Sequence, residues 1–197
     1  YAACVDAEND TVLEGNHGAG TGASVGKLLG FEHAMKSGIG TCGIQVGDLQ
    51  VAAIVAVNAC GNVVDYETNE LLAGVYDSHS GSVLKAQDVL FQQMDALRKL
   101  PEGNTTIGCF VTNAKLDKAQ CTKIAGIAHN GYARAIHPVH TMSDGDSIFV
   151  LSSGEVEVMA DAVGMLATEM MAKAIKRAVL HAESAYGLPA HSDVICK

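Results

Sequence analysis

The amino-acid sequence predicts a layered α/β sandwich with mixed β-sheets, and three observations lead to this fold class. Apolar runs of strand length alternate with helical patterns along the chain. Two further apolar runs flank Gly47-Asp48, which is a strong signal for a two-residue hairpin and hence for antiparallel pairing. The strands also outnumber those that a doubly wound fold needs, so the sheets are expected to be mixed.

The first half of the chain begins with a glycine-rich segment, residues 14–27, which leads into a short helical pattern at 25–35. Residues 49–57 are almost all apolar and end at Asn58, as is typical of a central strand covered on both faces. Residues 62–82 are polar and rich in turn residues.

The second half begins with a helical pattern at 83–100 that stops at Pro101. A loop then leads into an apolar strand at 106–112. Asp117 and Gln120 form a capping-box pattern that starts a helix running to about 135. The last two predicted elements are a strand at 147–152 and a helix at 155–183, whose acidic residues come early and basic residues late, as suits the helix dipole.

Composition excludes several classes of protein. The chain of 197 residues is expected to form a single domain, 1–197. A net charge of −9 disfavours binding to nucleic acid or to an anionic membrane. The six scattered cysteines show neither CxxC nor zinc spacing, which favours buried thiols in a reducing, cytoplasmic location. Tyr1 replaces an initiator Met, so we expect a processed product or a piece of a longer chain.

Two motifs do not fit the spacing of the cofactor or metal sites that they resemble. In the glycine-rich segment, Lys27 is followed by Leu28 rather than the hydroxyl residue of a phosphate loop, and the dinucleotide spacing also fails. The segment is either a tight backbone loop or a loop lining a substrate pocket. His137 and His140 flank Pro138 and lack further ligands at metal spacing, which favours a loop-structuring role. No cofactor and no metal are expected.

The most informative segment is residues 103–113, where a loop delivers Thr105 to the start of an apolar strand. A hydroxyl at neutral pH is a weak nucleophile and needs an adjacent base. If the bond between Asn104 and Thr105 is cut, the freed α-amine of Thr105 becomes such a base. These residues alone are equally typical of an ordinary strand start.

Four stretches in the same order give this chain a family resemblance. They are EGNHGAGTGA at 14–23, VAAIVAVN at 51–58 with GNVVD at 61–65, NTTIG at 104–108 with VTNA at 111–114, and ARAIHPVHT at 133–141 with DGD at 144–146. From residue 1 to about 183 the chain resembles the DmpA-like aminopeptidases, which include L-aminopeptidase/D-amidase-esterases and β-peptidyl aminopeptidases.

The resemblance implies a four-layer αββα sandwich with mixed β-sheets, like that of N-terminal-nucleophile hydrolases and ornithine acetyltransferase. In this family the precursor cuts itself before a Ser or Thr, which then becomes the nucleophile. Here that implies a cut between Asn104 and Thr105, giving 1–104 and 105–197, with Thr106 as the rival position. The family's N-terminal part is absent, so the chain corresponds to the C-terminal part of the fold.

The resemblance also implies the other site residues. Asn58 takes the place of the oxyanion-binding Asn. Asp144 and Asp146 take the place of the polar pair that orients the nucleophile's amine, with Ser143 as the alternative if the alignment shifts by one residue. The family's catalytic Tyr belongs to the absent part, and none of the tyrosines here is assigned to that role.

The implied function is a self-processing N-terminal-threonine hydrolase that releases N-terminal residues from small peptides, amides or esters through an acyl-enzyme. One alternative is an acyltransferase of the ornithine-acetyltransferase type. The other is an incomplete, non-catalytic family member. The expected partners are a small peptide or amide substrate, further copies of the chain in a homo-oligomer, and a separate chain as one source of the missing N-terminal part.

Overall fold

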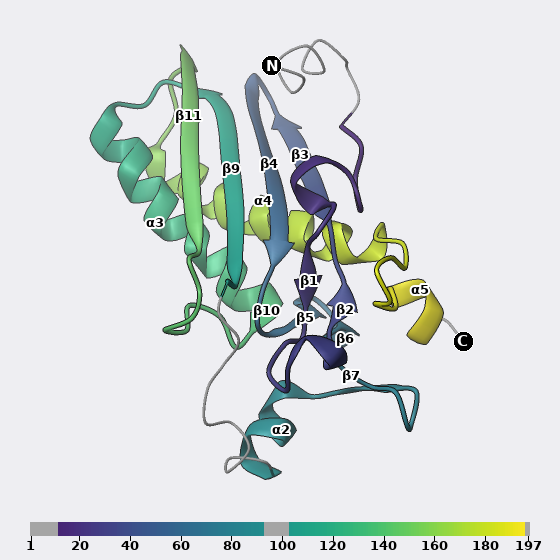
Figure 1. Cartoon of the computed structure of the whole chain (residues 1–197). Helices are drawn as coiled ribbons and strands as arrows, with labels where there is room; N and C mark the ends of the chain where they lie inside the picture. Colours follow the sequence, from purple (N-terminus) through teal and green to yellow (C-terminus); the bar gives the residue numbers. More distant parts are fainter. Residues whose placement is uncertain (1–11, 93–102, 196–197) are drawn as a thin grey trace.

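The computed structural model describes residues 12–92 and 103–195. Its main body is a four-stranded sheet in the order β11–β9–β4–β3, with two long helices packed on one face (Figure 1). β4 is antiparallel to both β3 and β9, whereas β11 runs parallel to β9, so the predicted mixed sheet is confirmed. The bounds are β3 Ile39–Val46, β4 Leu49–Asn58, β9 Thr105–Ala114, β11 Ser147–Val156, α3 Lys118–Ala135 and α4 Ala160–Leu180.

Shorter elements gather at one end of this sheet and form three small antiparallel sheets, β1–β2, β10–β5–β6 and β7–β8. Their bounds, with those of the short helices, are η1 Gly18–Gly20, β1 Ser24–Val25, η2 Phe31–His33, β2 Met35–Lys36, β5 Asn62–Asp65, β6 Glu70–Ala73, β7 Val75–Asp77, β8 Ser82–Leu84, α2 Ala86–Gln92, β10 Ile136–His137 and α5 His191–Val194.

Two local predictions are confirmed in detail. Val46 pairs with Leu49 across the hairpin turn, and Gly47 takes a positive φ of 61° that glycine adopts without strain. At the start of α3, Asp117 Oδ1 accepts the backbone N–H of Gln120 at 2.7 Å, and Gln120 Oε1 accepts that of Asp117 at 2.9 Å. This is the capping box expected from the sequence.

Two predicted boundaries are wrong because long-range contacts override the local pattern, and one segment contains strands that the sequence did not predict. Residues 25–35 contain strands β1 and β2 and the short helix η2 in place of a helix. The turn-rich segment 62–82 forms hairpins, held together where Asn62 accepts the N–H of Val75 and donates to the carbonyl of Leu84. β11 extends to Val156, whose carbonyl accepts the N–H of Lys115, so the last helix begins at 160 rather than 155.

The helix predicted at 83–100 is seen as α2 at 86–92. The predicted start is wrong, because Val83 and Leu84 belong to β8; the part from 93 to the end at Pro101 lies outside the described residues.

The hydrophobic core lies between the sheet and the helices α3 and α4. Val55, Phe110 and Met171 are fully buried in it. Glycines allow the layers to approach closely. A Cβ on Gly131 would lie 2.5 Å from the carbonyl oxygen of Thr168, and one on Gly40 would overlap with the backbone of α4. The core is therefore built from small residues and close backbone packing.

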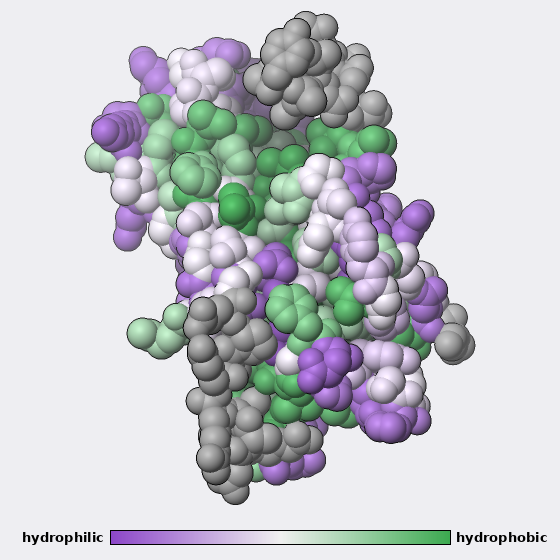
Figure 2. Space-filling model, in the orientation of Figure 1, coloured by the Kyte–Doolittle hydropathy of each residue, from purple (hydrophilic) through white to green (hydrophobic). Residues whose placement is uncertain are grey.

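The opposite face of the four-stranded sheet is apolar and open to solvent. We call this surface the open sheet face; it comprises Ala52, Ile54 and Ala56 of β4, Ile107, Cys109 and Val111 of β9, and Phe149 and Leu151 of β11. Phe149 is 61% exposed and Leu151 is 58% exposed. Figure 2 shows apolar residues gathered over the upper part of the sheet. An apolar sheet face of this kind normally packs against another layer.

None of the helices in the described ranges is both long enough and apolar enough to cross a bilayer.

Candidate active site

The start of β9 and the end of β4 bring Thr105 and Asn58 together. The two residues are paired across the antiparallel strands, at the lower end of the sheet in Figure 1. Because side chains alternate along a strand, both lie on the same side as Ile107 and Val111, the open sheet face. Thr106 points to the opposite side and is fully buried. A substrate that approaches the open face would therefore meet Thr105 rather than Thr106.

The hydroxyl of Thr105 lies beside the bond that the sequence predicts to be cut. Its Oγ1 donates to the carbonyl oxygen of Asn104 at 2.6 Å. Thr105 is partly exposed, whereas Asn104 is 1% exposed. The nucleophile candidate and the carbonyl that it would attack are thus held in contact.

The loop containing Asp144 and Asp146 packs against this strand start. Gly145 lies between them, and its N–H donates to the carbonyl of Asn104 at 2.8 Å. A Cβ on Gly145 would lie 2.8 Å from Thr105 Oγ1, which is closer than real Cβ contacts allow. Glycine is therefore required for the loop to approach the hydroxyl this closely.

The two aspartates make different contacts. Asp146 Oδ1 accepts the backbone N–H of Thr106 at 2.8 Å, one residue beyond the predicted nucleophile. Asp144 Oδ2 accepts the N–H of Thr141 at 2.8 Å, while its Oδ1 is buried without a hydrogen-bond partner among the described residues. The backbone of Asp144 forms an isolated parallel β-bridge with that of Asn104, so the loop is paired with the residue before Thr105.

The side-chain amide of Asn58 is oriented by three contacts. Its Oδ1 accepts the N–H of Ser24 at 3.2 Å and a proton of Lys27 Nζ at 2.8 Å. Its Nδ2 donates to the carbonyl of Gly103 at 3.0 Å. Since the oxygen faces two donors, the NH₂ group must face the loop that precedes Thr105. This is the orientation that an oxyanion donor needs.

Sequence reasoning missed Lys27. Its side chain is fully buried, and its Nζ also donates to the backbone carbonyl of Asn58 at 3.2 Å. Burial lowers the pKa of Lys27 to about 8, although the charges of Cys60 and Asp144 act in the opposite direction. Its ammonium group polarises the Asn58 amide and makes the NH₂ a better donor. The only signal in the sequence was a lysine within a glycine-rich loop.

The glycine-rich segment is held in place by a second buried lysine. Lys36 Nζ donates to the carbonyls of Gly20 and Ala23, both at 3.0 Å, and to that of Ser37. This segment in turn supplies the Ser24 N–H and the Lys27 ammonium to Asn58. The sequence left open whether this segment is a tight backbone loop or lines a pocket. In the structure it is a tight backbone loop that also contacts Asn58.

Within the described ranges, the thiol nearest the site is a poor nucleophile and no metal-binding group is found. Burial raises the pKa of Cys60 to about 11, and Asp144 adds to this shift while Lys27 opposes it. Such a thiol is protonated at neutral pH and inert. No group of three or more His, Cys, Asp or Glu side chains in the described ranges could hold a metal ion.

Residues 1–192 match the sequence model of peptidase family S58. The chain belongs to peptidase family S58. Among the curated S58-like relatives, an uncharacterized aminopeptidase of Mycobacterium leprae is 35% identical over 209 residues, covering 97% of this chain and 55% of that protein. A 6-aminohexanoate-oligomer endohydrolase of Paenarthrobacter ureafaciens is 30% identical over 182 residues, covering 84% of this chain and 50% of that protein.

Solved structures show the same fold. A β-aminopeptidase of a Burkholderia species superposes with a TM-score of 0.60 at 22% identity, over 94% of this chain and 53% of that one. The L-aminopeptidase D-Ala-esterase/amidase of Ochrobactrum anthropi, described as a variant of the Ntn-hydrolase fold, has a TM-score of 0.60 at 20% identity, over 92% and 51%. The predicted fold class and the family resemblance are confirmed.

The S58 chain described here spans about half the length of the relatives that it matches. Within that half, the structure brings Asn58, Thr105, Asp144 and Asp146 together at one end of the sheet. Their catalytic roles stay predictions.

Proposed function

We propose that this chain carries the nucleophile of a self-processing N-terminal-threonine hydrolase that cleaves small peptides, amides or esters. The observation that carries the proposal is the position of Thr105. It begins a strand on the open sheet face, pairs with Asn58, and places its hydroxyl 2.6 Å from the carbonyl oxygen of Asn104. Proximity of this kind is the condition for an intramolecular attack.

The first step would be self-cleavage. Thr105 Oγ attacks the carbonyl carbon of Asn104, and an ester bond forms while the peptide bond between the two residues breaks. The proton from the hydroxyl ends on the released α-amine of Thr105. Water then hydrolyses the ester, leaving a carboxylate on Asn104 and a free N-terminal threonine.

Self-cleavage would also free the oxyanion donor. In the described structure, Asn58 Nδ2 donates to the carbonyl of Gly103, which lies just before the predicted cut. Once the chain ends at Asn104, Gly103 is able to move away and leave the Asn58 amide pointing at the site. The cut would thus produce both a base, the α-amine, and an unoccupied hydrogen-bond donor.

Hydrolysis of a substrate would follow the same pattern. The α-amine of Thr105 takes the hydroxyl proton as Oγ attacks the substrate carbonyl, and the Asn58 NH₂ stabilises the developing oxyanion. The protonated amine then donates to the leaving group, and water hydrolyses the acyl-enzyme. Lys27 holds Asn58 in this orientation, and Asp146 holds the backbone at Thr106.

The relatives support an amide substrate. The names of these relatives describe an aminopeptidase and an endohydrolase of 6-aminohexanoate oligomers, and both kinds of enzyme act on the C–N bonds of amides. We therefore place the substrate among small peptides and linear amides. The expected cytoplasmic location and homo-oligomer stay predictions.

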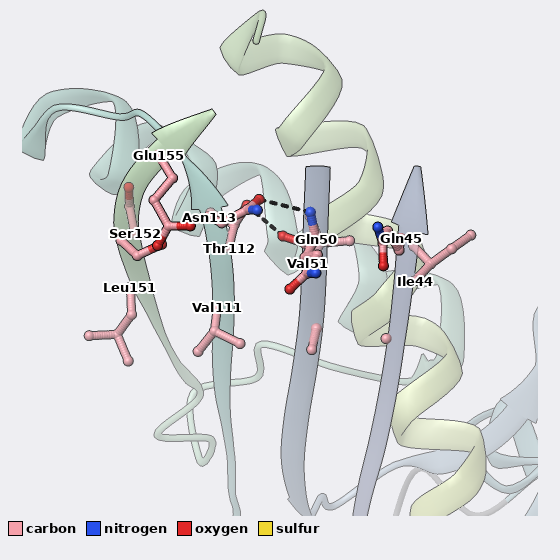
Figure 3. A pocket seen from close by; sticks show the side chains of 13 residues that line it. Ile44, Gln45, Gln50, Val51, Val111, Thr112, Asn113, Leu151, Ser152 and Glu155 are labelled. Carbon is pink, nitrogen blue, oxygen red and sulfur yellow. Dashed lines mark hydrogen bonds between the residues drawn. The ribbon is translucent and has the colours of Figure 1, made fainter. Parts of the chain in front are cut away.

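We further propose that the open sheet face is covered by the part of the family fold that this chain lacks, on the same or a separate chain. The chain spans about half the length of its relatives, and among the described residues helices pack on one face of the sheet. The upper end of the sheet is hollowed, where residues of β3, β4, β9 and β11 line a space of about 830 Å³ (Figure 3). A second layer there would place Thr105 between two sheets and exclude water from it.

The test is intact-mass spectrometry of the purified protein over time, followed by assays with aminoacyl-p-nitroanilides and short amide oligomers. We expect fragments 1–104 and 105–197 from the wild type and from Thr105→Ser, and an uncut, inactive chain from Thr105→Ala. Thr106→Val is the matched control and should still be cut after Asn104. A chain that stays whole but hydrolyses these substrates at full rate would rule out the mechanism. Transfer of the acyl group to added amines in preference to water would assign an acyltransferase.

A further inference from the structure

The carboxylate of Asp146 lies between the nucleophile strand and a histidine. Its Oδ1 accepts the Thr106 N–H at 2.8 Å, and its Oδ2 lies 2.9 Å from Nδ1 of His140. The Asp146 side chain is only 4% exposed. A carboxylate that is this buried needs a cation or several donors to offset the loss of hydration. His140 is the side chain that faces its second oxygen.

The backbone of His140 is shaped for this contact. Its φ of 56° lies in the left-handed region, which a residue with a side chain adopts at a cost. The residue is part of the loop between β10 and β11, in which Thr141 and Asp144 are also hydrogen-bonded to each other. The left-handed turn places the partly exposed imidazole against Asp146.

Two rings of α3 support His140 from behind. The ring centroid of His140 lies 4.8 Å from that of His129 and 6.1 Å from that of Tyr132. The hydroxyl of Tyr132 lies 3.5 Å from the carbonyl oxygen of Thr106. The cluster therefore reaches both backbone groups of Thr106, the N–H through Asp146 and the carbonyl through Tyr132.

The same residues interact electrostatically. Burial lowers the pKa of His129; the neighbouring His140 lowers it further, and Asp146 acts in the opposite direction. His129 Nδ1 is buried and has no hydrogen-bond partner in the described part of the chain. Burial thus disfavours the charged form of the His129 ring behind His140.

We propose that His140 is a positioning residue of this site. It holds Asp146, and through Asp146 the backbone of Thr106, so that Thr105 stays opposite Asn58 and against the Asn104 carbonyl. His140 itself touches neither the nucleophile nor the substrate. The proposal rests on the proposed function only in so far as the position of Thr105 matters for cleavage.

Two substitutions separate this role from general packing. The contact of His140 with Asp146 Oδ2 is an ion-pair distance of 2.9 Å without hydrogen-bond geometry. His140→Asn keeps a polar N–H group near the position of Nδ1, and asparagine tolerates the left-handed backbone. His140→Ala removes every polar group from that position. His137→Asn is the matched control, because the ring of His137 contacts the Ala133 carbonyl and not Asp146.

The first measurement is amide hydrogen exchange at Thr106, made by NMR in a Thr105→Ala background that keeps the chain whole. We expect His140→Ala to reduce protection of the Thr106 amide by roughly tenfold or more, as for a hydrogen bond of about 1.4 kcal/mol to a charged group. His140→Asn and His137→Asn should keep the wild-type protection. Unchanged protection in His140→Ala, with the rest of the spectrum unaltered, would overturn the proposal.

The second measurement is the rate of cutting after Asn104 with Thr105 restored. We expect His140→Ala to slow the cut by roughly tenfold or more, and His140→Asn to restore most of the rate. Equal rates in the two variants would also overturn the positioning role. If the wild type itself stays uncut, the proposed function fails, and the exchange experiment still decides the role of His140.

Discussion

Asn58 and Thr105 face each other across two antiparallel strands, each at the end of its strand and both on the open sheet face. The pairing places a side-chain amide next to a hydroxyl without a flexible loop between them. Sites built on strands are held more precisely than sites built on loops. The relationship leads to predictions about the site, its buried lysines and the open sheet face.

Replacing Asn58 should remove the oxyanion donor. We expect Asn58→Ala to lower kcat for an aminoacyl-p-nitroanilide by about 10²–10³-fold, the range found when one such donor is lost. Asn113→Ala is the control, because Asn113 lies at the other end of β9 and bonds the hairpin at Asp48 and Gln50. Steady-state kinetics on the cut protein measure both. A rise in KM with kcat unchanged would argue against an oxyanion role.

Adding a methyl group at Gly145 should obstruct the nucleophile. The new Cβ would lie 2.8 Å from Thr105 Oγ1, so the hydroxyl must shift away from the Asn104 carbonyl. We expect Gly145→Ala to slow cutting by roughly tenfold or more. Gly126→Ala in α3, where the Cβ meets nothing within 4 Å, should leave the rate unchanged. Time-resolved intact mass measures both, and equal rates would contradict the contact.

Removing Lys36 should destabilise the glycine-rich segment. Its ammonium serves three backbone carbonyls and is fully buried, so Lys36→Met would leave those carbonyls without their donor. We expect the free energy of unfolding to fall by about 3 kcal/mol or more, since each buried unsatisfied group costs about 1–3 kcal/mol. Lys85→Met, at an exposed position, should change it by less than about 0.5 kcal/mol. Urea unfolding of both variants provides the comparison.

The buried Lys27 should make stability depend on pH. Burial lowers the pKa of Lys27 to about 8 in the folded protein, from 10.5 for a lysine exposed to water. Between these values the unfolded chain binds more protons than the folded one, so this contribution to stability rises with pH and is constant below the window. Relative to Lys27→Met, the wild type should gain about 2 kcal/mol between about pH 8 and about pH 9.5. Parallel pH profiles of the two proteins would contradict the lowered pKa.

A charge on the open sheet face should weaken its apolar character without unfolding the chain. Phe149 is 61% exposed, so Phe149→Lys should change the free energy of unfolding by less than about 1 kcal/mol. It should also reduce the fluorescence of a bound hydrophobic dye and weaken any association through this face. Met165→Lys on α4, at a residue 73% exposed, is the control and should affect neither. Equal dye binding by the wild type and Phe149→Lys would argue that the face is not the apolar docking surface.

The elements predicted well from sequence are those with a local cause. The hairpin at Gly47 follows from a two-residue turn, and the start of α3 follows from the reciprocal bonds of Asp117 and Gln120. The hairpins of segment 62–82 were not predicted, because they depend on Asn62, whose partners Val75 and Leu84 are distant in sequence. Local periodicity carries no information about such contacts.

The candidate site divides in the same way. The resemblance to a known family was needed to single out Thr105, Asn58 and the pair around Gly145, because the residues by themselves are equally typical of an ordinary strand start and an ordinary turn. Lys27 and His140 could not be found in that manner, since each acquires its meaning only from a neighbour brought close by folding. Chemical identity is a property of each residue, whereas burial, strand register and the direction of a side chain arise only when the sheet and helices pack together.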